Sequence, residues 1–144
     1  MTFAAQGRPA ISLVDDDFHS ARLMTRMLLA HGGPEVEHLP DAASAITELA
    51  ARMNPADGPF FVIVDLKATS TATREFIAQL KQKAPQLLVI AMARTLDRAV
   101  RDDLIEAGAA AVFERHADLN LYRREAASII AFWVRGQRLD AVGT

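Results

Sequence analysis

The stretch that decides the fold is Phe60 to Asp65, FFVIVD, in which five consecutive apolar residues end on a carboxylate. Two aromatic and three β-branched residues are typical of a strand that is covered on both faces, and such strands belong to parallel sheets. An acid at the carboxyl end of such a strand faces the crevice in which α/β proteins bind ligands. The segment therefore predicts a central strand with a functional acid, Asp65, at its tip.

Four other segments have the composition of strands, and apolar residues at helical spacing lie between them. This alternation predicts an α/β fold with a doubly wound, five-stranded parallel sheet. If the strand order is 2-1-3-4-5, as in flavodoxin-like folds, the direction of winding reverses between the first and third strands. The other predicted strands are Ile11 to Val14, Val36 to Leu39, Leu87 to Met92 and Ala110 to Phe113.

Polar and glycine residues mark the ends of the predicted helices. Asp17 or Ser20 is expected to cap the first helix, and Gly32 follows its end. The last helix is expected to begin near Asp118 or Asn120. It carries one apolar stripe, formed by Tyr122, Ala126, Ile129, Ile130 and Trp133.

Length, charge and composition restrict the class of protein. The 144 residues suit one domain, which we expect over residues 10–136, with an N-terminal tail at 1–9 and a C-terminal tail at 137–144. The formal net charge of −2 and the scattered basic residues disfavour nucleic acid and anionic membranes as partners. The absence of cysteine excludes disulfides and thiol chemistry. No stretch has the length of a membrane helix or the core of a signal peptide, so we expect a cytoplasmic protein.

The main chemical signal is a group of acids at the ends of the first and third strands. In the expected strand order, Asp15, Asp16 and Asp65 converge at one edge of the sheet. Such carboxylates repel one another unless a cation neutralises them, and oxygen ligands favour Mg²⁺. The alternative is that they are solvated loop acids and helix caps.

Four motifs in this order and spacing resemble the receiver domain of two-component response regulators, with a flavodoxin-like, CheY-like fold. They are LVDDDF (Leu13 to Phe18), VIVDL (Val62 to Leu66), VIAMAR (Val89 to Arg94) and GAAAVFER (Gly108 to Arg115). The resemblance covers about Pro9 to Val134. It implies a stand-alone but atypical member of a family of signalling proteins, and not an enzyme.

The resemblance also implies roles for individual residues. Asp65 is the phosphoacceptor, which receives a phosphoryl group from a histidine kinase or a phosphotransfer protein. Mg²⁺, or alternatively Mn²⁺, is ligated by Asp16, Asp65 and the backbone carbonyl of Lys67, with Asp15 assisting through water. The alternative function is a pseudo-receiver, a protein interaction module that no longer uses phosphorylation.

The sequence departs from the family at four positions. Ala93 replaces the expected hydroxyl residue and Val112 the expected aromatic, so the usual switch between phosphate and output surface is degenerate. Phe113 is adjacent to Val112 but should point the opposite way. Arg115 stands where the family has a lysine, and it retains the positive charge with a different geometry. His116 stands where the family has a proline.

Two further basic residues, Lys67 and Arg94, lie at the same rim. Each of these residues has three alternative roles. It pairs with the acids in place of a metal ion, it contacts the phosphoryl group together with Arg115, or it points into water. The last helix carries additional apolar surface on a flank, which suggests a partner or homodimer surface. The flank positions are Leu121, Ser128 and Phe132. The alternative is that Phe132 and Trp133 only seal the edge of the sheet.

Overall fold

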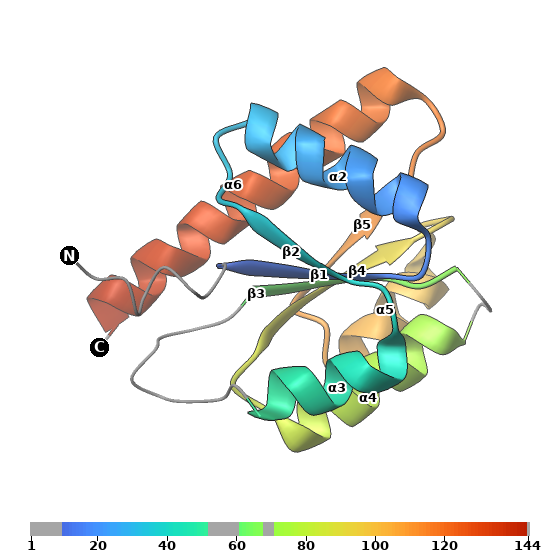
Figure 1. Ribbon diagram of the computed structural model, residues 1–144, viewed down its shortest axis with the longest axis vertical. Coiled ribbons are helices and arrows are strands. Elements are labelled where there is room, and N and C mark those ends of the chain that lie inside the picture. Colours follow the sequence, from blue (N-terminus) through green and yellow to red (C-terminus); the bar gives the residue numbers. More distant parts are fainter. Residues whose placement is uncertain (1–9, 52–60, 68–70, 144) are drawn as a thin grey trace.

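The structure is a computed structural model that describes the backbone of residues 10–51, 61–67 and 71–143, and side chains up to residue 136 (Figure 1). The predicted tail at 1–9 and Phe60, the first residue of the FFVIVD segment, lie outside the described residues. No helix in the described part of the chain is both long and apolar enough to cross a membrane.

Five parallel strands form one sheet in the order β2-β1-β3-β4-β5, which confirms the predicted fold and strand order. The central strand β3 is buried along its whole length, as its apolar composition requires. The observed strands start or end one residue away from the predicted positions at β1, β4 and β5. The strands are β1 (Ile11–Asp15), β2 (Val36–Leu39), β3 (Phe61–Asp65), β4 (Leu88–Ala93) and β5 (Ala111–Glu114).

Helices cover both faces of the sheet (Figure 1). The helices α2 (Phe18–Ala30) and α6 (Leu119–Gly143) pack on one face, and α3 (Ala42–Ala51), α4 (Ala72–Lys83) and α5 (Arg98–Ala107) pack on the other. Each face has its own apolar core, because side chains along a strand alternate between the two faces. The backbone of α6 continues through residues 137–143.

Local hydrogen bonds explain where the helices begin. The Asp17 carboxylate accepts hydrogen bonds from the backbone N–H groups of His19 and Ser20, so Asp17 caps α2 and Ser20 lies inside the helix. Asp118 accepts a hydrogen bond from Leu121 N–H in the same way at the start of α6. These caps orient α2 and α6 directly after the carboxyl ends of β1 and β5.

The contact between α2 and α6 requires a glycine at position 33. A Cβ atom there would collide with the side chain of Ile130 on α6 and would lie 2.7 Å from the backbone oxygen of Leu28. The neighbouring Gly32 has φ +81°, a left-handed conformation that suits a residue without a side chain. The paired glycines therefore end α2 and allow α6 to pack closely beside it.

The apolar stripe of α6 faces the sheet, as predicted, and the structure favours the alternative in which Phe132 on its flank seals the sheet. The Phe132 ring centroid lies 5.9 Å from that of Phe61 on β3 and 6.4 Å from that of Phe113 on β5. Phe132 is therefore partly buried and seals the sheet, whereas Leu121 is 43% exposed. Among residues 119–136 of α6, the large apolar residues that are exposed lie in its first turn and are Leu119 and Leu121.

Candidate functional site

Two carboxylates from distant parts of the sequence meet at the carboxyl edge of the sheet. Asp15 ends β1, Asp65 ends β3, and the two residues are direct partners in the parallel register. Both are completely buried. Asp16, one residue further, is exposed, and its carboxylate accepts a hydrogen bond from Lys67 N–H, at 3.1 Å and 3.2 Å from its two oxygens. The structure thus brings Asp15 and Asp65 together, while Asp16 lies toward solvent.

The side chain of Lys67 bridges the two buried carboxylates. Its Nζ lies 2.6 Å from Asp15 Oδ1 and 3.1 Å from Asp65 Oδ2. The contact with Asp65 Oδ2 is an ion pair whose geometry does not suit a hydrogen bond, and the ammonium group instead donates to the backbone oxygen of Asp65. The Lys67 side chain is 22% exposed, so the ammonium group closes the site toward solvent.

Arg115 contacts Asp65 from the other side. Its Nε and Nη2 lie 2.8 Å and 2.7 Å from Asp65 Oδ1. The backbone N–H of Arg115 donates to the carbonyl oxygen of Ala93, which anchors the segment after β5 to the end of β4. The guanidinium group of Arg115, the residue that the resemblance aligns with a lysine of receiver domains, thus forms two charge-assisted contacts with one oxygen of Asp65.

Burial determines the electrostatics of Asp15. Desolvation raises the pKa of Asp15 above its ordinary value, and the hydrogen bonds from Lys67 and from Asp17 N–H oppose this shift. Because folding raises the pKa of Asp15, its contribution to stability is fully present at pH values below the pKa that it has in the unfolded chain. This contribution is lost as the pH rises through the pKa that Asp15 has in the folded protein. Lys67 therefore stabilises an anion that burial disfavours.

A hollow of about 490 Å³ lies beside the acid pair. Lys67, Arg94 and Arg115 contribute three cationic side chains to its walls, and Thr95 contributes a hydroxyl group. Arg94 makes no ion pair with any residue that the structure describes. Asp103 also lines the hollow but pairs with Arg74, and the buried acids next to the hollow are paired as well, so an anionic group of modest size fits its charge.

The structure explains the positions that depart from the family pattern. Ala93 ends β4 and has only a methyl group toward the hollow, so it donates no hydrogen bond there. Val112 packs in the core beneath α5, whereas Phe113 packs in the core beneath α6, which confirms that they point in opposite directions. His116 lies between two acids, 3.5 Å from Glu114 and 3.7 Å from Glu125.

The arrangement of these groups does not fit the expected magnesium site. Across the described residues, no three His, Asp or Glu side chains gather closely enough to hold a metal ion. Asp15 Oδ2 and Asp65 Oδ2 are buried and accept no hydrogen bond from the described residues, so unused ligand atoms exist. However, the Lys67 ammonium group already lies between the two carboxylates. Magnesium at Asp15, Asp16 and Asp65 stays a prediction.

Two residues near the site were not singled out from the sequence for this role. His38 on β2 contacts the backbone oxygen of Asp15 through Nε2 at 2.8 Å. The Tyr122 hydroxyl is buried and has no hydrogen-bond partner in the described part of the chain. Burial raises the pKa of Tyr122, as do the charges of Asp65 and Asp15. The helical stripe predicted that Tyr122 is buried, but no sequence signal indicates that it lies near the acids.

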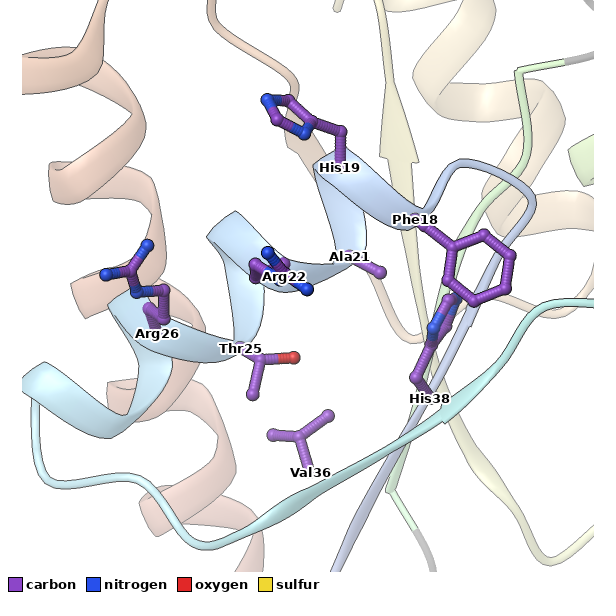
Figure 2. A pocket seen from close by; sticks show the side chains of 8 residues that line it. All are labelled: Phe18, His19, Ala21, Arg22, Thr25, Arg26, Val36 and His38. Carbon is purple, nitrogen blue, oxygen red and sulfur yellow. The ribbon is translucent and has the colours of Figure 1, made fainter.

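A second hollow, of about 460 Å³, lies between α2 and the edge strand β2 (Figure 2). Its basic lining residues are His19, Arg22, Arg26 and His38, and none of the described residues that line it is an acid. Phe18 is 70% exposed, and its ring meets the His38 ring edge-on with the centroids 5.1 Å apart. Through His38, this basic hollow is connected to the backbone of Asp15.

Comparisons with known proteins identify the fold. No protein-family model matches the chain, and no curated protein matches its sequence. Solved structures do match. The Mn²⁺-bound form of response regulator Rcp1 is 20% identical, with a TM-score of 0.69 over 88% of this chain and 94% of that chain. A response regulator receiver domain from Rhodospirillum rubrum is 16% identical, with a TM-score of 0.71 over 86% and 92%.

A third structure carries a modified acid. It is a response regulator protein from Burkholderia pseudomallei with a phosphorylated aspartic acid, a calcium ion and citrate. It is 20% identical to this chain, with a TM-score of 0.58 over 91% of this chain and 83% of that chain. These similarities show that the chain has the CheY-like fold of response regulator receiver domains. At such low sequence identities the similarity shows the fold, and the chemistry of the site depends on its own residues.

Proposed function

We propose that this protein is a single-domain receiver that accepts a phosphoryl group on Asp65 from a histidine kinase or a phosphotransfer protein. The observation that carries the proposal is a buried carboxylate at the end of β3 that is held between two cationic side chains, Lys67 and Arg115. A carboxylate that attacks a phosphoryl group needs positive charge on both sides of the reacting atoms. The fold, with its receiver-domain neighbours, supports the same function.

In the proposed step, an oxygen of Asp65 attacks the phosphorus atom of a phosphorylated histidine. A P–O bond forms and the P–N bond breaks, and the electron pair stays on the imidazole nitrogen, which takes a proton from water. Asp65 needs no general base, because it reacts as a carboxylate. Oδ2 is the candidate nucleophile, since it accepts no hydrogen bond from the described residues, whereas Oδ1 contacts Arg115 twice.

Access to Asp65 requires a side chain to move. Lys67 and Arg115 are each 22% exposed and lie over the buried acids. The hollow beside them, with Arg94 in its wall, would receive the phosphoryl group when one of the two cations turns outward. Arg94 and the cation that turns outward would then contact the phosphoryl oxygens.

The identity of the cation at the acid pair is a separate question. Mg²⁺ or Mn²⁺ at Asp15, Asp16, Asp65 and the Lys67 carbonyl is the candidate from the sequence. Similar structures that hold Mn²⁺ or calcium support a divalent ion. The ion pairs of Lys67 with Asp15 and Asp65 favour another candidate, the ammonium group of Lys67 itself.

The direct test uses a small phosphodonor such as acetyl phosphate, with intact mass as the measurement. Wild-type protein should gain the mass of one phosphoryl group, and Asp65→Asn should gain none, because an amide does not attack phosphorus. Asp102→Asn is the matched control, since Asp102 is an acid on α5 that is 66% exposed and is not among the described residues that line the hollow. It should be modified as wild type is.

The second candidate is a pseudo-receiver, an interaction module that does not use phosphorylation. Complete burial of Asp65 favours it, as does the lack of a hydroxyl group at Ala93. If neither acetyl phosphate nor phosphorylated histidine kinases modify Asp65, whichever divalent cation is added, this second function replaces the first. In either case the protein acts as a signalling module, and we place it in the cytoplasm.

The first turn of α6 is the proposed surface for homodimers. Leu119 and Leu121 are exposed apolar residues there, and one receiver domain of similar fold was solved as a dimer. We expect Leu121→Glu to lower self-association at micromolar concentrations, measured by sedimentation, without loss of folded structure. Arg123→Gln, two positions beyond Leu121, lowers the net charge by the same one unit and controls for the change in charge. Equal sedimentation of wild type and Leu121→Glu would exclude this surface.

A further inference from the structure

The ammonium group of Lys67 lies where a bridging cation belongs in a pair of buried carboxylates. We propose that Lys67 is a tethered cation that takes the place of a divalent metal ion between Asp15 and Asp65. The acid pair is then neutralised by the chain itself, and the wild-type protein has no high-affinity site for Mg²⁺ or Mn²⁺ at these residues.

Three contacts of Lys67 Nζ support this role. Nζ contacts one oxygen of each carboxylate, at 2.6 Å and 3.1 Å, so a single positive charge bridges both strands. It also donates to the backbone oxygen of Asp65 at 3.1 Å. That acceptor orients the ammonium group toward the acids although the lysine stem is long and flexible.

The charge balance of the site supports it as well. Two buried carboxylates are unfavourable unless they are paired. Lys67 and Arg115 supply two positive charges for these two negative ones, so the pair is already neutral without an ion. A divalent ion that entered while both side chains remained would leave the buried site with an excess of two positive charges, which burial disfavours.

The ligand atoms support it further. Asp15 Oδ1 already accepts hydrogen bonds from Lys67 Nζ and from Asp17 N–H. The exposed carboxylate of Asp16 accepts from Lys67 N–H and does not join the buried acids in a group of three ligands. A metal ion would therefore have to displace the ammonium group and also reorient Asp16.

Competition of this kind depends on the tether. Because Lys67 is only two residues from Asp65, its ammonium group is held at the site at a high effective concentration, and a free ion has to compete with it. Removal of the ammonium group should therefore create a metal site from the same acids. The inference deepens the proposed function by naming its cation, but it can be tested on the unmodified protein.

The experiment compares wild type with Lys67→Met, which keeps an apolar stem of similar length and removes the charge. Mn²⁺ binding is measured by electron paramagnetic resonance of the free ion, and Mg²⁺ binding by the shift in Tm. We expect no saturable binding by wild type at millimolar ion, and an affinity at least about tenfold higher in Lys67→Met, with a rise in Tm by mass action. Lys83→Met removes an exposed lysine and should behave as wild type.

A further variant identifies the ligands. In Lys67→Met/Asp15→Asn the gained binding should be lost, because one of the two carboxylates is gone. If Lys67→Met does not fold, the wild-type measurement alone decides. Saturable Mn²⁺ binding by wild type that broadens the NMR signals of Asp15 and Asp65 would overturn the proposal. Equal affinity in wild type and folded Lys67→Met would also overturn it.

Phosphorylation is measured separately in the presence of EDTA. Wild type modified on Asp65 by acetyl phosphate without divalent ions would support both the tethered cation and the proposed function. If no condition modifies Asp65 but only Lys67→Met gains a metal site, the proposed function fails and the tethered cation stands. If Asp65 is modified only when Mg²⁺ is present, the proposed function stands and the tethered cation is overturned.

Discussion

Replacement of Arg115 by methionine should destabilise the folded protein by about 2 to 3 kcal/mol at neutral pH, because it leaves Asp65 Oδ1 buried without its partner. Both Nε and Nη2 of Arg115 contact this oxygen, and Asp65 is completely buried. The expected loss is smaller than for a fully enclosed pair, since the Arg115 side chain remains 22% exposed and water partly screens it. Urea unfolding of the two proteins measures the difference.

A double-mutant cycle separates this pair from general damage to the fold. In Asp65→Asn/Arg115→Met most of the lost stability should return, because the buried amide carries no charge. Arg101→Met is the matched control, since Arg101 is 59% exposed and forms only a distant pair with Asp102. It should change stability by less than about 0.5 kcal/mol. If Arg115→Met is as stable as wild type, the contact with Asp65 does not form in solution.

The second large effect concerns Phe132. Phe132→Ala should cost about 2 kcal/mol, below the range for a fully buried phenylalanine because this ring is only partly buried. Phe132→Glu should cost more, because its carboxylate would lose water against the rings of Phe61 and Phe113. Thermal unfolding followed by circular dichroism measures both losses.

This prediction has a control on the same helix. Leu121→Glu also introduces an acid into α6, but Leu121 is 43% exposed, so its Tm should stay close to that of wild type. A Tm for Phe132→Glu equal to that of Leu121→Glu would show that Phe132 does not pack against the sheet. Phe132→Glu is consequently unsuitable as a probe of the dimer surface, although the sequence pattern placed this residue on an outer flank.

Periodicity and composition were sufficient to predict the fold. The run from Phe61 to Val64 is apolar at every position, so only a strand covered on both faces satisfies it, and a parallel sheet with helices on both sides follows. The strand order places the ends of β1 and β3 together, and Asp15 and Asp65 indeed meet there. The strands follow from local pattern, whereas the meeting of the acids depended on a strand order that local pattern does not fix and that the resemblance to receiver domains supported.

Side-chain direction at the site could not be read in the same way. Asp15 and Asp16 are adjacent and chemically identical, yet Asp15 is buried and Asp16 is exposed, because the chain turns at the end of β1 and only one of the two side chains faces β3. For Lys67, the sequence left three alternatives open: pairing with the acids, contact with a phosphoryl group, or exposure to solvent. The ion pairs at 2.6 Å and 3.1 Å favour the first.

By itself, the sequence determined an α/β fold with acids at the ends of its first and third strands, because these follow from which residues are apolar and where strands end. The strand order 2-1-3-4-5 was a hypothesis that the resemblance to receiver domains supported, and of the three acids that it was expected to bring together, two are buried side by side. Only the tertiary structure decided which charges neutralise those acids. Arg115 follows Lys67 by 48 positions in the sequence (115 − 67), and the two residues follow different strands, β5 and β3. Their contact with the same carboxylate depends on the path of each loop and on long side chains with several rotamers, which no local pattern encodes.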